Sequence, residues 1–124
     1  EDGIEPLGVI PDMIDAYRGI DVAVNPVLCG TGLNIKSIEA LGFGVPLVAT
    51  PSGARGLEQT EGQGLSIAES AQDFADAVIS LVLDRGLRQQ AGSRAIETAR
   101  EWNGSALARL AQMLEKRPPS GSRP

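Results

Sequence analysis

Short apolar runs alternate with longer helical stretches along most of this chain, and this alternation is the feature that most limits its fold. Strand-like runs are predicted at residues 5–10, 21–26, 46–50 and 64–68. The run at 46–50 is apolar up to its last residue, which is typical of a strand covered on both faces. Strands that alternate with helices favour a parallel sheet with helices on its faces. The sequence therefore predicts an α/β fold.

The helical stretches have recognisable starts and ends. Asp12 is the predicted N-cap of a short helix over residues 13–18, and Ser70 that of a longer helix over 71–83. A helix from about residue 34 to 42 ends before Gly44, which suits a left-handed residue at a helix C-terminus. These signals place the helices between the strands and after the last strand.

The last forty residues are predicted to be helical and then disordered. We expect helices over 87–102 and 105–116, followed by a disordered tail at 117–124 with the sequence R-P-P-S-G-S-R-P. Residues 1–116 would then form a single domain. Four strands are few for this architecture, and the chain begins at Glu1 without an initiator methionine. We interpret it as a piece of a longer protein, with the first β-α units of the domain upstream.

Composition excludes several kinds of chemistry. The chain has no histidine and one cysteine, Cys29, which excludes imidazole catalysis, an internal disulfide and zinc sites built on either residue type. We interpret Cys29 as a small buried residue. The formal net charge of −5 argues against a nucleic-acid-binding surface. No apolar stretch is long enough to cross a bilayer.

Two glycine-rich loops follow predicted strands, at residues 29–33 and 51–56. Ligands of open parallel sheets bind at the carboxyl ends of the strands, so both loops are candidate binding elements. The first loop leads directly into a helix N-terminus, where free backbone N–H groups and the helix dipole favour an anion such as a diphosphate. The candidate ligand-binding residues here are Gly30, Thr31, Gly32, Leu33 and Asn34.

Lys36 and Glu39 extend this candidate site along the helix. The helix dipole disfavours a cation in the first turn, so a negative group is expected near Lys36. That group is either Glu39, three residues further on, or a bound phosphate. The adjacent glycine turn favours the phosphate. A P-loop and a dinucleotide fingerprint are both rejected because Ile35 stands where each motif needs glycine.

Residues 21–57, DVAVNPVLCGTGLNIKSIEALGFGVPLVATPSGARGL, resemble the donor-binding half of GT4-like glycosyltransferases with the two-domain GT-B fold. The shared pattern is a strand ending in proline, a G-x-G turn, a helix carrying E-A-L, and then a strand that leads into a second glycine-rich loop. The flanking residues agree, so the resemblance covers nearly everything except the tail. It implies a Rossmann-like parallel sheet flanked by helices, with residues 1–116 forming part of the nucleotide-sugar-binding domain.

The resemblance also implies roles for individual residues. The family has two glutamates separated by seven residues. The second matches Glu39 and would bind the ribose hydroxyls, while the first matches Thr31, which offers only a hydroxyl and its backbone. Lys36 would stand near the donor phosphates. Lys36 and Glu39 are thus the candidate catalytic residues, and no metal ligand is expected.

The implied activity is transfer of a sugar from a UDP- or GDP-sugar donor to a glycan or lipid-linked acceptor, with retention and without a metal or other cofactor. An amino-terminal acceptor domain would complete the enzyme, which would act in polysaccharide biosynthesis in the cytoplasm or at the inner face of the membrane. Three alternatives remain open. They are a non-catalytic nucleotide-sugar-binding module, suggested by Thr31, a nucleotide-sugar epimerase on the same fold, and a structural half-domain in which Lys36 and Glu39 only pair with each other.

Overall fold

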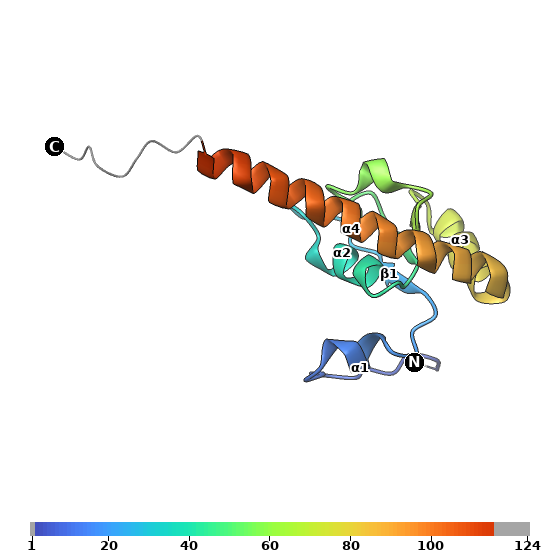
Figure 1. The fold of residues 1–124 in the computed structure, drawn as a ribbon. Helices are drawn as coiled ribbons and strands as arrows, with labels where there is room; N and C mark the ends of the chain where they lie inside the picture. The colour runs from blue at the N-terminus through green and yellow to red at the C-terminus, as the bar shows by residue number, and fades with distance from the viewer. Residues whose placement is uncertain (1, 116–124) are drawn as a thin grey trace.

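Three short parallel strands form the centre of the chain in the computed structural model, which describes residues 2–115 (Figure 1). The strands β1 (Ala23–Asn25), β2 (Leu47–Ala49) and β3 (Leu65–Ile67) lie side by side in chain order. In the register, Val48 of β2 lies opposite Val24 of β1 and Ser66 of β3. The predicted α/β fold with a parallel sheet is confirmed.

Helices cover this sheet because its central strand is apolar on both faces. All three residues of β2 are buried. The helix α2 (Ile35–Gly42) packs on β1 and β2, α3 (Ala71–Leu83) packs on β2, and the long helix α4 (Arg85–Glu115) packs against both helices. The buried cluster between them consists of Leu41, Leu47, Ala49, Ala54, Leu57, Leu65 and Ala95. Burial of this apolar surface is the main force that holds the strands and helices together.

Three residues predicted to begin or end helices do so in the structure. The carboxylate of Asp12 accepts a hydrogen bond from the backbone N–H of Ile14, at 2.8 Å, at the start of α1 (Met13–Tyr17). The hydroxyl of Ser70 accepts one from the backbone N–H of Asp73, at 3.0 Å, at the start of α3. Gly44, which follows α2, has a φ of +75°. The predicted caps and the predicted left-handed glycine are therefore confirmed.

The strand predicted at residues 5–10 is wrong. These residues lie outside any strand and are exposed or nearly so, with Val9 95% accessible. Gly8 has a φ of +68°, which is incompatible with an extended strand, and Pro6 has no backbone N–H to donate to a neighbour. The described part of the chain thus has three strands rather than the four expected.

The predicted division of the C-terminal region into two helices is also wrong. Residues 85–115 form the single helix α4, which passes through Gly104 without a break and crosses α2 (Figure 1). A glycine inside a helix costs about 1 kcal/mol, which a 31-residue helix with a packed first half tolerates. Lys116 and the predicted tail at 117–124 lie outside the described residues. No helix within residues 2–115 has the length and apolar character needed to cross a bilayer.

Candidate functional site

The two glycine-rich loops meet at one edge of the sheet. Because β1 and β2 are parallel, their carboxyl ends lie at the same edge, and the loops that follow them are neighbours. The hydroxyl of Thr50, just after β2, donates to the backbone carbonyl of Val27, just after β1. The hydroxyl of Ser52 donates to the carbonyl of Leu28, at 3.2 Å. The sheet therefore brings the two predicted binding loops into direct contact.

A buried hydrogen-bond network joins the end of β1 and the second loop to the first turn of α2. The side-chain amide of Asn25 donates to the hydroxyl of Ser37, at 2.9 Å, and that hydroxyl donates to the backbone carbonyl of Gly53, at 2.6 Å. Asn25 and Ser37 are 8% and 0% exposed. Burial away from water makes these bonds costly to break, so the network fixes the start of α2 against β1 and the second loop.

Sequence reasoning missed Asn25 and Ser37. One signal pointed to Ser37, because it lies three and four residues before the apolar pair Ala40 and Leu41 and so shares their buried face of α2. A polar residue on such a face needs a partner. Asn25 has a comparable signal as the polar last residue of a strand that is otherwise apolar.

The start of α2 is open to solvent. The predicted residues Gly30, Thr31, Gly32 and Leu33 are exposed, and Gly32 has a φ of +89°. Asn34 occupies the N-cap position, yet its side chain makes no capping hydrogen bond. The first backbone N–H groups of α2 therefore have no side-chain cap, and the helix dipole adds to their preference for an anion.

Lys36 is exposed in the first turn of α2 and does not pair with Glu39. The ion pairs within residues 2–115 are Arg18 with Asp15 and Arg88 with Asp21. The structure therefore does not form the lysine–glutamate pair on which the purely structural alternative depended. Lys36 stands beside the uncapped helix start, which leaves its ammonium available to an anion bound there.

Glu39 lies half-buried on α2, next to Tyr17 of α1. The ring of Tyr17 stacks on Phe43, with centroids 4.7 Å apart and planes 11° from parallel. Burial, hydrogen bonding with Glu39 and the negative charge of Glu39 together raise the pKa of Tyr17 to about 12. No local pattern in the sequence pointed to the stack of Tyr17 on Phe43.

The described surface has hollows beside this site. One of about 420 Å³ lies between α2 and α4 and is lined in part by Glu39, Arg100 and Trp102. Another, of about 450 Å³, begins at Gly56 of the second loop and also reaches Trp102. Trp102 is partly buried and packs against the core cluster. The turn residues 30–34 line neither hollow, so they form an exposed surface rather than an enclosed pocket.

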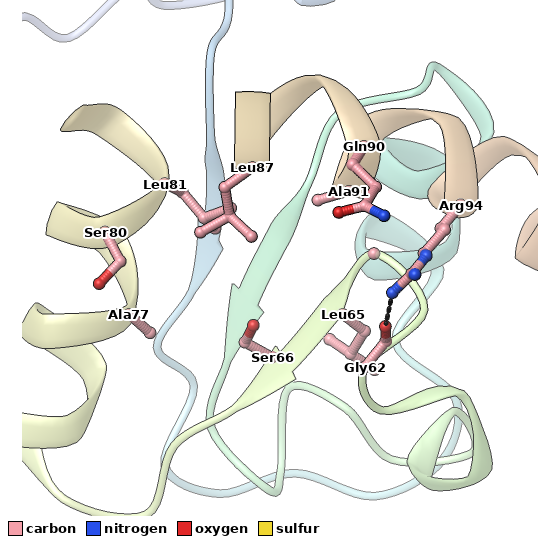
Figure 2. Close-up of a pocket in the computed structure, with 11 residues that line it drawn as sticks. Gly62, Leu65, Ser66, Ala77, Ser80, Leu81, Leu87, Gln90, Ala91 and Arg94 are labelled. Atoms are coloured by element: carbon pink, nitrogen blue, oxygen red, sulfur yellow. Dashed lines mark hydrogen bonds between the residues drawn. The ribbon is translucent and has the colours of Figure 1, made fainter. Parts of the chain in front are cut away.

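A third hollow lies beside β3, the edge strand opposite β1. It has a volume of about 270 Å³ between β3, α3 and α4, and Ser66, Ser80 and Gln90 contribute polar groups to its lining. Figure 2 shows the guanidinium of Arg94 there, donating to the backbone carbonyl of Gly62 at 3.4 Å. None of the predicted site residues lines this hollow.

The cysteine and the acidic side chains are the remaining groups that could react or bind a metal ion. Cys29 is exposed at the start of the first loop, so the prediction that it is buried is wrong. It lies among exposed neighbours because the chain leaves the sheet at Pro26. Within residues 2–115, no group of three or more acidic or cysteine side chains is placed to hold a metal ion.

A family model and two individual relatives all relate this chain to glycosyltransferases. The family model described as "Glycosyl transferases group 1" matches residues 1–84, which end directly after α3. A D-inositol 3-phosphate glycosyltransferase of Corynebacterium jeikeium is 33% identical over 116 residues, covering 90% of this chain and 27% of that protein. A protein of the same name from Kribbella flavida is 31% identical over 105 residues, covering 82% of this chain and 24% of its own length. The chain thus spans about a quarter of the length of these relatives.

Proposed function

This chain belongs to the glycosyl transferases group 1 family, and we propose that it forms most of the nucleotide-sugar-binding domain of a GT4-like enzyme with the GT-B fold. The enzyme transfers a sugar from a UDP- or GDP-sugar to a hydroxyl-bearing acceptor. The observation that carries this proposal is the exposed, uncapped start of α2, which the two joined glycine-rich loops present at the carboxyl edge of the sheet.

Residues 30–34 and the first amides of α2 hold the donor diphosphate in this proposal, and Lys36 adds a positive charge beside it. In the reaction, the bond between the anomeric carbon and the diphosphate oxygen breaks, and a bond to the acceptor oxygen forms with loss of the acceptor proton. Negative charge grows on the departing nucleoside diphosphate. Backbone N–H groups and the Lys36 ammonium stabilise that charge as it develops, which lowers the barrier.

Glu39 binds the ribose of the donor. An ionised carboxylate accepts hydrogen bonds from two adjacent hydroxyls at once, which suits the 2′ and 3′ positions of a nucleotide. Glu39 is only half-buried and lies one turn beyond Lys36 along α2. Diphosphate and ribose therefore contact successive turns of one helix. Retention of configuration and independence of metal ions belong to the same proposal.

The acceptor site lies on a part of the enzyme outside this chain, in an amino-terminal domain. The two relatives are named for D-inositol 3-phosphate. For this protein we propose a glycan, lipid-linked or phosphorylated polyol acceptor, met in the cytoplasm or at the inner membrane face.

Thr31 favours a second candidate function, a nucleotide-sugar-binding module without turnover. It stands where the family has the first of its two glutamates, and it is exposed in the turn. A hydroxyl there cannot supply the negative charge of a carboxylate near the transferred sugar. This candidate predicts donor binding without release of nucleoside diphosphate.

Calorimetric titration of the full-length protein with UDP and GDP tests the site. Lys36→Gln is expected to weaken binding of the nucleoside diphosphate about tenfold, and binding of the monophosphate less, because it removes one charge-assisted contact. Arg85→Gln, at the distant start of α4, is the matched charge control and should leave affinity unchanged.

Absence of UDP and GDP binding, or equal losses in the two variants, would overturn the proposed function. Release of nucleoside diphosphate in the presence of glycan, lipid-linked and inositol phosphate acceptors then separates the two candidates. Turnover supports the transferase, and tight binding without turnover supports the module.

A further inference from the structure

We propose that the hollow of about 450 Å³ beside the second loop binds a sugar ring. This hollow begins at Gly56 and lies between the 3-10 helix η1 (Glu58–Thr60) and α4. Its lining includes neither Lys36, Glu39 nor the turn at 30–34. It is therefore a second site, and the inference rests on the proposed function only for the source of the sugar.

The floor of the hollow is held by hydrogen bonds. Leu57 and Thr98 line it and are both buried. The hydroxyl of Thr98 donates to the backbone carbonyl of Gln63, at 2.8 Å, which ties the chain after η1 to α4. The hydroxyl of Thr60 donates to the backbone carbonyl of Leu57, at 2.6 Å, which holds η1 itself. The hollow is thus formed before a ligand arrives, and binding costs less ordering.

The walls of the hollow carry polar side chains that are open to a ligand. Five of them are exposed and take part in none of the side-chain hydrogen bonds or ion pairs within residues 2–115, namely Gln59, Gln63, Glu101, Ser105 and Arg109. Their amide, hydroxyl, carboxylate and guanidinium groups supply both donors and acceptors. A ligand rich in hydroxyls suits this set, because each hydroxyl both donates and accepts.

The unbroken course of α4 places three of these side chains on one side of the hollow. Glu101, Ser105 and Arg109 follow one another at intervals of four residues, so they lie on the same face of the helix. The predicted break before Ser105 would have separated them. Gln59 and Gln63 line the same space from η1 and the residues after it. Two elements thus offer hydrogen-bonding groups to one ligand.

Trp102 supplies the apolar surface that a sugar ring also needs. Its side chain lines the hollow and packs against the core cluster, so the indole is held in place. An indole combines a large apolar surface with one N–H donor. The ring carbons of a sugar pack against such a surface while its hydroxyls remain available to the polar side chains.

The charges of the hollow favour a neutral ligand over an anion. Glu58 and Glu101 contribute two carboxylates, and Arg109 contributes one guanidinium. A second diphosphate would meet more negative than positive charge here, unlike at the start of α2. Leu57 and Trp102 are the large apolar residues of the described lining, which is too little apolar surface for a lipid chain. A sugar ring fits both conditions.

The hollow adjoins the turn that holds the diphosphate in the proposed function. A Cβ atom on Gly56 would lie 2.8 Å from Cδ1 of Leu33, a residue of that turn, so the turn contacts the rim of the hollow. A sugar ring reaches this place from one of two sources. It is either the transferred sugar of the donor or a sugar unit of the acceptor glycan, and both present the same ring carbons and hydroxyls.

Fluorine NMR of the full-length protein labelled with 5-fluorotryptophan tests the hollow directly. Trp102 is the only tryptophan of this chain, and the loss of its signal in Trp102→Phe identifies it. The probes are glucose, galactose, mannose, N-acetylglucosamine and myo-inositol, together with UDP-glucose, UDP-galactose, UDP-N-acetylglucosamine and GDP-mannose. We expect the Trp102 signal to shift with at least one of them.

Glu101→Ala should weaken this response about three- to tenfold, the loss of one or two hydrogen bonds. Glu97→Ala is the matched control, because Glu97 is exposed one turn earlier on α4 and does not line the hollow. Three results would overturn the sugar site. They are no shift with any probe, equal losses in the two variants, and a shift that UDP or GDP alone produces in full.

Calorimetric titration of the same variants identifies the source of the sugar. If the sugar belongs to the donor, Glu101→Ala weakens binding of the nucleotide sugar and leaves binding of UDP or GDP unchanged. If it belongs to the acceptor, the variant weakens binding of the free sugar, measured with UDP or GDP present, and leaves nucleotide-sugar binding unchanged. Absence of UDP and GDP binding would overturn the proposed function, whereas the response of Trp102 to free sugars tests the hollow independently.

Discussion

The two loops that meet at the edge of the sheet share a glycine-rich sequence but differ in how the protein holds them. The first loop, between β1 and α2, is exposed from residue 26 to residue 33. The second, after β2, contains Gly53 and Ala54, both buried, and ends at Leu57, which is 1% exposed. One loop faces solvent and the other is part of the core.

Their glycines are needed for different reasons. A Cβ atom on Gly53 would lie 2.5 Å from the carbonyl oxygen of Asn25 and 3.3 Å from the Cβ of Ala49, so the second loop needs glycine to fit against β1 and β2. A Cβ on Gly32 would meet nothing within 4 Å, but its backbone has a φ of +89°. The first loop thus needs glycine for its conformation and leaves space above the backbone, as a ligand site requires. A glycine-rich sequence after a strand therefore does not by itself identify a binding loop.

Gly53→Ala should produce the largest loss of stability. The added methyl group meets backbone on β1, which cannot move without disturbing the Asn25–Ser37 hydrogen bond. We expect the free energy of unfolding to fall by about 3 kcal/mol, as for an overpacked core. Urea denaturation followed by circular dichroism measures it.

Gly32→Ala is the matched variant in the exposed loop. Only the positive φ opposes it, and we expect a loss of about 1 kcal/mol in stability together with weaker nucleotide binding. Equal losses in the two variants would contradict the division into a packed loop and an open one.

Ser37→Ala should have an effect second only to Gly53→Ala, because it removes the hydroxyl that links the end of β1 to the second loop. The buried amide of Asn25 and the carbonyl of Gly53 would lose their partner. Unsatisfied buried groups cost about 1–3 kcal/mol each, so we expect a loss of roughly 2 kcal/mol after relaxation. Ser93→Ala, at an exposed position of α4, is the control. A change no larger than in that control would show that the buried network does not hold the second loop against β1 and α2.

Much of the fold could be predicted from the sequence, because short segments of sequence determine the strands and the helix starts. Apolar runs bounded by proline and glycine located β1, β2 and β3, and hydroxyl or carboxyl side chains located the starts of α1 and α3. The errors arose where tertiary context overrides a local signal. Gly104 and Ser105 indicate a helix break, yet packing of the preceding residues Ala95, Ala99 and Trp102 on the core keeps α4 continuous.

The candidate site could be predicted from the sequence only in part. The turn at 30–34, Lys36 and Glu39 are adjacent in sequence, and a motif reveals such residues. Asn25 and Gly53 come from different segments and meet through the sheet register. Tyr17, from a separate helix, meets α2 through its stack on Phe43. Contacts of this kind depend on three-dimensional packing, which spacing along one chain does not encode.

Acid titration of Glu58 should reveal the smallest difference between the loops. Backbone N–H groups of Glu58 itself and of Gly56 hold the pKa of this carboxyl below its ordinary value of 4.5, and the Gly56 N–H donates to it at 2.9 Å. Because the folded-state pKa is lowered, the contact stabilises the fold above the unfolded pKa and is lost as the pH falls through the folded value. The Gly56 amide signal, followed by NMR, should therefore shift with a midpoint below 4.5, while the Gly32 amide stays unchanged and overall stability changes little at this exposed position. A midpoint at or above 4.5 would show that these backbone contacts do not stabilise the ionised carboxylate. A parallel shift at Gly32 would mean that the two loops respond as one unit.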